Sequence, residues 1–374
     1  MDGKKELNEL LDRIRNGNPS RADLKRYADW CDRFQHTPDK IADFPEIKRK
    51  MSTRIREQMT PRYRVLRRWG YAAACAMLFF FGWLGWRAIE FGEEKVEMST
   101  VNPPADVLPG GNRATLELDN GERFDLSKEQ AGIVMEEGGI SYVDGETVVN
   151  KLPETSHQYV LSTPKGGQYQ LTLPDGSKVW LNAATTLKYP SHFTDSARVV
   201  ELIGEAFFEI RKVTNEKGRI PFLVKTEGQT VEVLGTEFSI SAYPEESLTR
   251  TTLKEGAVRI TDHETKKHSE LQPHMQSIVG NGSIRIEKVD VSAEIAWKNG
   301  LFIFNETPLK EAMNQLSRWY DVEVVYDPEV PSALFFGVIS RNTKLRSVLN
   351  ILKEGGVRFQ LVSSESGNKL MVLP

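Results

Sequence analysis

The chain has 374 residues, a length that excludes a single small domain and allows two or three. Its 49 basic and 52 acidic residues give a net charge of −3, and with a mean hydropathy of −0.42 the average composition is typical of a soluble protein. The charge is unevenly distributed, however. Residues 1–68 hold 18 basic against 11 acidic residues, a net charge of +7, and the remainder carries −10.

Residues 1–60 are predicted to form three short helices, each with one apolar face. Their apolar positions are Leu7, Leu10, Leu11 and Ile14; then Leu24, Tyr27, Trp30, Cys31 and Phe34; then Ile47, Met51 and Ile55. Three narrow apolar faces build only a small core, so we expect part of this surface to bind a partner, with Trp30 and Phe34 as anchors. The alternative is that these two aromatic residues fill the segment's own core.

A transmembrane helix is predicted over residues 69–90. Trp69–Trp86 is a run of 18 residues without a charge. As a helix this run would be about 27 Å long, which nearly matches the hydrocarbon core of a bilayer. A buried core helix would carry polar positions on one face, and a cleaved signal peptide would begin close to Met1, so both alternatives fit less well.

The residues that flank the span predict its orientation. Nine Lys or Arg residues lie between Lys48 and Arg68, whereas only Arg87 and Lys95 occur over a comparable stretch after the span. The positive-inside rule therefore places the N-terminus in the cytoplasm and the residues after the span outside. The same basic residues are explained by their effect on membrane topology and by contacts with lipid headgroups. No direct nucleic-acid binding is therefore expected.

Residues 91–112 are biased toward proline and acidic residues, which is typical of a linker. A β-rich lead-in is predicted over 113–154, and an all-β domain, sandwich or solenoid-like, over 155–290. Turn signals recur about every 8–12 residues between alternating segments, as in Asp119-Asn120-Gly121 and Pro174-Asp175-Gly176. This spacing favours antiparallel strands over a parallel sheet covered by helices.

The pattern changes again in residues 297–374, which are predicted to form a small α+β domain in the order β-α-β-β-α-β-β. Thr307 is predicted to cap the first helix, with Pro308 at its first position, and Thr343 to begin the second. Such open sheets leave edge strands available for pairing with a partner. The predicted fold class is therefore multi-domain: a small all-α N-terminal segment, one transmembrane helix, an all-β domain and a small α+β C-terminal domain.

Several short motifs resemble the FecR family of bacterial anti-sigma regulators in order and spacing. They include Thr163-Pro164-Lys165-Gly166-Gly167, Leu173-Pro174-Asp175-Gly176-Ser177, Trp180-Leu181-Asn182, Gly204-Glu205-Ala206-Phe207-Phe208, Val231-Glu232-Val233-Leu234-Gly235-Thr236-Glu237-Phe238 and Glu255-Gly256-Ala257-Val258. The resemblance covers roughly 155–289. Residues 297–374 resemble the C-terminal domain that follows in many members, which is similar to the secretin and TonB short N-terminal domain. The first two helices resemble the family's cytoplasmic anti-sigma helices.

The resemblance implies a purpose for each part. The helical segment would hold an extracytoplasmic-function sigma factor in the cytoplasm, and its contact candidates are Leu10, Leu11, Tyr27, Trp30 and Phe34. The chain would cross the bacterial inner membrane once, and its C-terminal domain would receive a periplasmic signal from the signalling domain of a TonB-dependent outer-membrane receptor. Release of the sigma factor would be a shift in population rather than catalysis. Intramembrane and periplasmic proteases are further implied partners.

No enzyme, cofactor or metal site is expected. The sequence has no nucleophile elbow, no phosphate-binding loop and no Cys-x-x-Cys pair, and the spacing of His263 and His268 is not that of a helical zinc site. Some members of the family resemble this chain at a Gly-Thr pair and cut themselves there, which makes Gly235-Thr236 a candidate self-cleavage site, because a threonine hydroxyl can attack the preceding carbonyl. A strand bulge that requires glycine explains the same pair, and we favour it because no base can be assigned from the sequence.

The principal alternative function is that of a membrane-anchored periplasmic scaffold or glycan-binding module. Trp180, Tyr189 and Phe193 would then form an aromatic platform on the all-β domain, although aromatic residues on such strands more often fill the core. A membrane-tethered hydrolase is a third alternative, and it lacks a recognisable set of catalytic residues.

Overall fold

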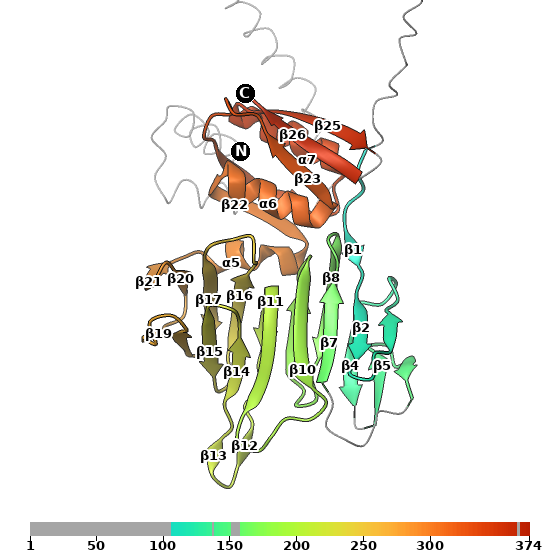
Figure 1. Cartoon of the computed structure of the whole chain (residues 1–374), viewed down its shortest axis with the longest axis vertical. Coiled ribbons are helices and arrows are strands. Elements are labelled where there is room, and N and C mark those ends of the chain that lie inside the picture. Colours follow the sequence, from blue (N-terminus) through green and yellow to red (C-terminus); the bar gives the residue numbers. More distant parts are fainter. Residues whose placement is uncertain (1–105, 137, 151–157, 365–366) are drawn as a thin grey trace, which may run out of the picture. The chain divides into compact units, whose positions relative to one another are not determined.

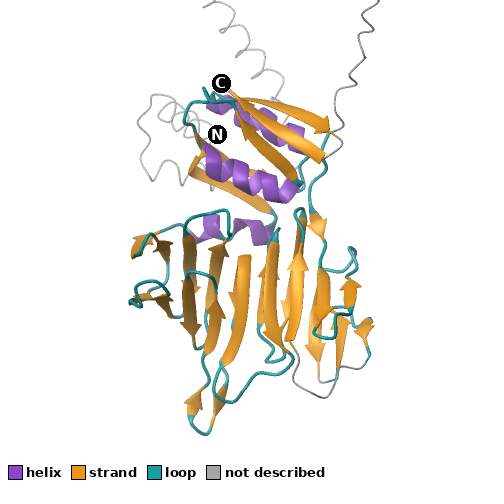
Figure 2. Ribbon diagram, in the orientation of Figure 1, coloured by secondary structure: helices purple, strands orange, loops and turns teal. Residues whose placement is uncertain are grey.

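The computed structural model describes residues 106–374, apart from residue 137, residues 151–157 and residues 365–366. The predicted cytoplasmic helices, the predicted span and the first part of the predicted linker lie outside these residues. Within the described part of the chain, no helix is long and apolar enough to cross a membrane. Strands predominate there (Figure 2), which confirms the β-rich character predicted for the residues after the linker.

The first part of the described chain is a two-layered β domain (Figure 1). One layer has the strand order β3-β2-β7-β10-β11-β14-β15-β18-β19, and the other has the order β6-β5-β4-β8-β9-β11-β16-β17-β20-β21. The strands of the first layer are β2 (Thr115–Leu118), β3 (Arg123–Asp125), β7 (Gln158–Thr163), β10 (Thr185–Pro190), β11 (Arg198–Glu209), β14 (Phe222–Lys225), β15 (Gln229–Val233), β18 (Val258–Asp262) and β19 (His268–Leu271). Those of the second are β4 (Gly132–Glu136), β5 (Gly139–Tyr142), β6 (Thr147–Val149), β8 (Gly167–Thr172), β9 (Lys178–Leu181), β16 (Glu237–Ala242), β17 (Thr249–Glu255), β20 (Met275–Gly280) and β21 (Ser283–Lys288). A short hairpin, β12 (Thr214–Asn215) and β13 (Gly218–Arg219), stands apart from both.

Strand β11 belongs to both layers because it changes sheet at Gly204. Its first half pairs with β10 and β14, and its second half pairs with β9 and β16. Gly204 has a φ of +99°, and a Cβ there would lie 2.6 Å from the Thr185 hydroxyl oxygen, so only glycine fits this crossing. The strand therefore fixes the two layers against each other.

Alternating apolar residues from both layers meet in one continuous core. Phe208 stacks on Phe238 at 5.0 Å between ring centroids and contacts Phe222 of the other layer at 6.4 Å. The lead-in strands share this core through Leu116 and Ile133, which are fully buried. Strand β2 also pairs with β7, and β4 pairs with β8, so residues after 113 extend the β domain.

The C-terminal domain has the predicted order β-α-β-β-α-β-β. Its elements are β22 (Leu301–Pro308), α6 (Leu309–Tyr320), β23 (Val322–Tyr326), β24 (Leu334–Ser340), α7 (Leu345–Leu352), β25 (Arg358–Ser364) and β26 (Gly367–Leu373). Strands β22 and β24 form an antiparallel pair, and β23-β26-β25 form a second sheet. Two short helical turns, α5 (Val291–Glu294) and η1 (Ala296–Asn299), connect this domain to the β domain.

Both predicted helix starts are displaced in the structure. Strand β22 continues through Pro308, α6 begins at Leu309, and the Thr307 hydroxyl accepts a hydrogen bond from the Asn305 N–H instead of capping the helix. Helix α7 begins at Leu345 rather than at Thr343. At α6 the chain pairs with β24 through Pro308, so this long-range contact overrides the local capping signal.

Candidate functional site

The five predicted sigma-factor contacts lie outside the described residues. They are Leu10, Leu11, Tyr27, Trp30 and Phe34, and their role stays a prediction.

Gly235 and Thr236 lie in the short connection between β15 and β16. Gly235 has a φ of +148°, and the pairing of β16 with β17 shifts register between Glu237 and Phe238, as at a strand bulge. The Thr236 hydroxyl donates a hydrogen bond to the Ala257 carbonyl at 3.0 Å. This backbone contact gives the hydroxyl a structural partner, so the geometry favours the bulge.

Asp175 has a structural explanation. Its carboxylate accepts hydrogen bonds from the Ser177 N–H and hydroxyl, at 2.9 and 2.8 Å, and this closes the predicted Pro-Asp-Gly turn. It also pairs at 2.6 Å with Arg198, whose side chain is almost completely buried. The turn and the start of β11 are therefore held together by a buried ion pair.

The three residues proposed for a glycan platform do not share one exposed surface. Tyr189 is buried in the core, and Phe193 packs edge-on against Phe222. Trp180 lies beneath Lys298, whose ammonium nitrogen is 3.7 Å from the ring centre. Two of the three aromatic side chains thus pack in or against the core, and the third supports the connection to the C-terminal domain.

The structure instead brings five polar residues together where the two domains meet. We call Asn182, Glu205, Tyr243, Arg318 and Arg341 the junction cluster. The Asn182 side-chain N–H donates to the Glu205 carboxylate at 2.7 Å, and the Asn182 side-chain oxygen accepts from the Arg341 guanidinium at 2.9 Å. Asn182 and Glu205 come from the β domain and Arg341 from the C-terminal domain, so these bonds join the two domains.

Arg318 of α6 forms a second connection. Its guanidinium lies 3.7 Å from the centre of the Tyr243 ring and pairs with the carboxylates of Glu245 and Glu246 at 3.0 and 2.9 Å. The Tyr243 hydroxyl donates to the Ala183 carbonyl at 2.9 Å, which fixes the ring on which Arg318 rests. Stacking on an aromatic face and pairing with a carboxylate are interactions to which the planar guanidinium is suited.

Arg341 is only 2% exposed. Its guanidinium lies 3.7 Å from the centre of the Trp319 ring and also donates to the Trp297 carbonyl at 3.1 Å. The Trp319 indole N–H in turn donates to the Arg341 carbonyl at 2.8 Å. Arg341 is therefore held by α6, by η1 and by Asn182 at the same time.

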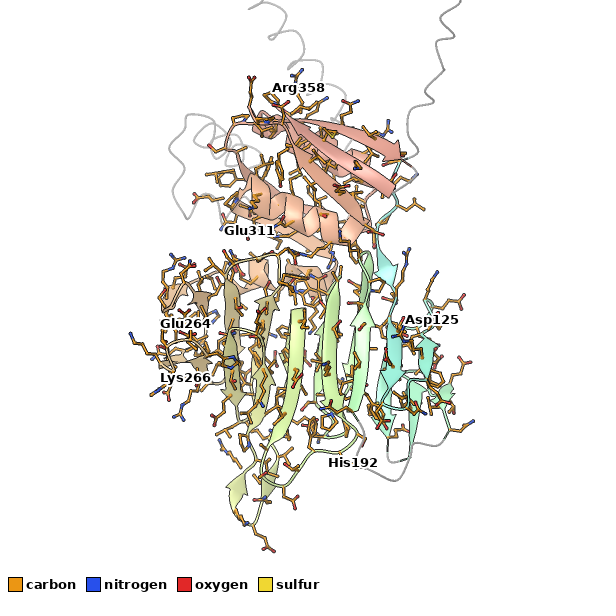
Figure 3. The ribbon with its side chains drawn as sticks, viewed as in Figure 1. Asp125, His192, Glu264, Lys266, Glu311 and Arg358 are labelled. Atoms are coloured by element: carbon orange, nitrogen blue, oxygen red, sulfur yellow. The ribbon has the colours of Figure 1, made fainter. Side chains whose placement is uncertain are left out.

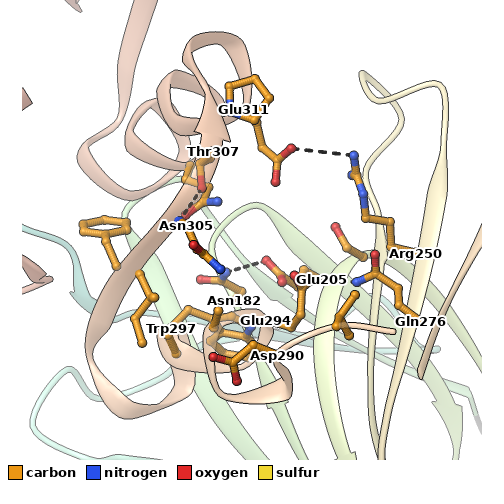
Figure 4. A pocket seen from close by; sticks show the side chains of 18 of the residues that line it. Asn182, Glu205, Arg250, Gln276, Asp290, Glu294, Trp297, Asn305, Thr307 and Glu311 are labelled. Atoms are coloured by element: carbon orange, nitrogen blue, oxygen red, sulfur yellow. Dashed lines mark hydrogen bonds and ion pairs between the residues drawn. The ribbon is translucent and has the colours of Figure 1, made fainter. Parts of the chain in front are cut away.

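A cavity of about 570 Å³ adjoins the junction cluster (Figure 4). Its lining includes Glu205, Glu294 and Arg250 from the β-domain side and Glu311 from α6. Arg250 and Glu311 approach each other to 3.8 Å across this space, and Figure 3 shows where Glu311 lies on α6. Charged groups therefore face the cavity from both domains.

Burial alters the titration of two carboxyls in this cavity. Burial raises the pKa of Glu294 to about 7, although a hydrogen bond from Gln276 opposes the shift. Burial also raises the pKa of Glu205, against the opposing effects of Arg318 and of the hydrogen bond from Asn182. The charge of Glu294, and with it the charge of the cavity wall, therefore depends on pH near neutrality.

This arrangement is suited to holding the two domains together. Each charged side chain named in the junction cluster has a hydrogen bond or ion pair with a neighbour, and no nucleophile is poised beside a base among them. Among the described residues, no group of three His, Cys, Asp or Glu side chains is placed to hold a metal ion.

The C-terminal domain also presents an exposed apolar surface. On β24, Leu334, Phe336 and Val338 alternate along one face and are 54%, 64% and 60% exposed. Within the described residues, β24 pairs with β22 alone, so its other edge carries no strand. A contiguous apolar face beside a free strand edge is typical of a protein-binding surface.

Two members of the junction cluster could have been identified from the sequence. Asn182 and Glu205 both lie within the short motifs that carry the family resemblance, and Glu205 is a carboxylate surrounded by apolar strand residues. Arg318 and Arg341 have no comparable local signal, because their partners are up to 159 residues away.

Comparisons with known proteins agree with this two-domain layout. The family model for the FecR protein matches residues 159–259, and the model for the FecR C-terminal domain matches residues 301–369. Two crystal structures of a candidate anti-sigma factor from Parabacteroides distasonis ATCC 8503, at 1.65 and 2.50 Å resolution, are 36% identical in sequence, with a TM-score of 0.51. Each match covers 57% of this chain and 97% or 98% of the solved chain. No curated protein matches.

Proposed function

The chain belongs to the FecR family, and from that premise we propose that it is a transmembrane anti-sigma regulator of the bacterial inner membrane. Residues 1–60 hold an extracytoplasmic-function sigma factor in the cytoplasm, the span over 69–90 crosses the membrane once, and the residues that follow lie in the periplasm. The observation that carries the proposal is the likeness, over almost the whole length of the solved chain, to a candidate anti-sigma factor.

In this regulator the C-terminal domain receives the signal. Its exposed β24 face and free strand edge suit an added strand from the signalling domain of a TonB-dependent receptor, because an edge strand offers unpaired backbone groups and its alternate side chains offer specificity. Release of the sigma factor is then a change in the population of bound states. Proteolysis within the periplasm and the membrane makes the release irreversible.

The test uses the full chain in detergent, with the sigma factor encoded beside it and the signalling domain of the neighbouring receptor as two separate baits. Joint substitution of Trp30 and Phe34 by serine should abolish capture by the sigma factor and leave capture by the receptor domain unchanged. Joint substitution of Phe336 and Val338 by serine should have the opposite effect. Failure of the unaltered chain to bind the sigma factor would contradict the proposal.

A further inference from the structure

The residues just before the β domain are fastened to both domains. We call residues 106–112 the clasp. The Asp106 carboxylate accepts a hydrogen bond from the Arg346 N–H at 3.0 Å, and the Val107 carbonyl accepts from the Leu345 N–H at 3.1 Å. These are the first two N–H groups of α7, a helix that has no side-chain cap of its own. The clasp therefore supplies the N-terminal cap that α7 lacks.

The clasp also packs against the C-terminal domain. Val107 is only 9% exposed and belongs to the core that contains Trp319 and Leu345. Gly110 passes so close to that domain that a Cβ there would lie 2.8 Å from the Trp319 ring and 2.6 Å from the Gly166 carbonyl oxygen. Only glycine fits this gap without displacing its neighbours.

The other end of the clasp belongs to the β domain. Gly111 and Asn112 form strand β1, which pairs in parallel with the start of β8, and the Gly111 N–H donates to the Gly166 carbonyl at 2.9 Å. The Gly166 N–H in turn donates at 2.7 Å to the Arg318 carbonyl near the end of α6. The Gly166 turn thus contacts the clasp and the C-terminal domain together.

We propose that the clasp transmits a movement of the C-terminal domain to the residues that precede it, which lead to the predicted membrane span. The clasp is complete only when both domains are in place, because Asp106 and Val107 bind one domain and Gly111 binds the other. A partner that moves the C-terminal domain away from the Gly166 turn must break the contacts of the clasp with at least one of the two domains. Release of the clasp frees about seven residues, which can extend by up to about 25 Å.

This inference rests on the proposed function for its biological consequence, but its structural part can be tested separately. Gly110→Ala should prevent the clasp from seating, because the added Cβ meets Gly166 and Trp319. Gly111→Ala is the matched control, since a Cβ at the adjacent glycine meets nothing within 4 Å. Asp106→Ala is a milder variant that removes only the cap, and exposed Asp195 provides its control.

The first measurement is amide hydrogen exchange of the full chain in detergent micelles. Gly110→Ala should accelerate exchange at the Leu345 and Gly111 amides on the order of tenfold. Asp106→Ala should accelerate exchange at Arg346 roughly fivefold, the usual effect of a lost helix cap. Gly111→Ala and Asp195→Ala should match the unaltered chain. Unchanged exchange in both clasp variants would overturn the inference, whatever the chain's function.

The second measurement is transcription from a sigma-dependent reporter in cells without the receptor's inducing ligand. Gly110→Ala should raise transcription several-fold at equal protein abundance, and Gly111→Ala should leave it repressed. Faster exchange in Gly110→Ala with fully repressed transcription would show that the clasp opens without signalling, and this too would overturn the inference. Failure of the proposed function has a different signature, because the unaltered chain would then not bind the sigma factor at all.

Discussion

At the scale of single residues, Arg341 connects three parts of the described chain: α6, η1 and Asn182 of the β domain. Its guanidinium bonds to the Asn182 side chain and the Trp297 carbonyl while its plane rests on Trp319. A lysine keeps the charge, but it cannot stack on the Trp319 ring in this way or donate hydrogen bonds in two fixed directions. Exchange of Arg341 for lysine should therefore disturb this site.

We therefore expect Arg341→Lys to lower the free energy of unfolding of the 100–374 fragment by about 1–3 kcal/mol, since at least one buried acceptor loses its donor. Urea unfolding measures this change, and Arg219→Lys in the exposed β13 hairpin is the control. Equal stabilities of the Arg341→Lys fragment and the unaltered fragment would show that the charge alone matters.

Glu294, which lines the cavity beside the junction cluster, makes the stability of the protein depend on pH. Burial raises its pKa from the ordinary value of 4.5 to about 7, so between these values the folded state holds a proton that the unfolded state has released. The contribution of Glu294 to stability is therefore present below pH 4.5 and is lost as the pH rises toward 7. Its slope is at most about 1.4 kcal/mol per pH unit.

We expect Glu294→Gln to remove this part of the pH dependence from the free energy of unfolding of the 100–374 fragment. Denaturant titrations at several pH values between 4.5 and 8 measure it, with Glu216→Gln in an exposed turn as the control. If the curves of the unaltered fragment and of Glu294→Gln run parallel throughout, the carboxyl titrates normally and the prediction is wrong.

At the scale of elements, the connection between β15 and β16 allows a prediction about the integrity of the chain. The Thr236 hydroxyl bonds to the Ala257 carbonyl, and Gly235 has a backbone conformation that favours glycine. A strand bulge accounts for the glycine, and the hydroxyl already has a backbone partner, whereas attack on the preceding carbonyl needs a base. We expect immunoblots to show one full-length band, identical for the unaltered chain and Thr236→Ala. A shorter C-terminal fragment that disappears in Thr236→Ala would establish self-cleavage.

The elements could be predicted from the sequence where their signals are local. Alternating residues and Asn-Gly or Asp-Gly turns identify the strands of the β domain, and helical spacing identifies α6 and α7. The clasp could not be predicted, because it lies in a longer stretch, residues 91–112, whose composition is typical of a linker, and its partner in α7 is 240 residues away. The junction cluster was missed for the same reason: polar residues that meet between domains have the same local pattern as polar residues on a surface.

At the scale of the whole molecule, the uneven charge of the chain bears on its expected orientation in the membrane. Where the two domains of the described chain meet, Arg318 and Glu246 form a largely buried ion pair. The basic residues before the predicted span have no such partners predicted from the sequence, and their concentration within about 20 residues of the span is what the positive-inside rule requires. Orientation in the membrane should therefore depend on these residues and not on the total charge of the N-terminal part.

We expect a C-terminal alkaline phosphatase fusion of the full chain to be active, because the enzyme folds only outside the cytoplasm. Exchange of Arg62, Arg64, Arg67 and Arg68 for glutamine, together with Glu93→Lys and Glu94→Lys, should lower this activity several-fold by weakening or inverting the charge bias. Exchange of four distant arginines for glutamine, Arg13, Arg15, Arg21 and Arg26, removes the same four positive charges from the part before the span and should leave the activity unchanged. An inactive fusion of the unaltered chain would place its C-terminus in the cytoplasm. The C-terminal domain would then be separated from any periplasmic receptor, and the clasp could not report on one.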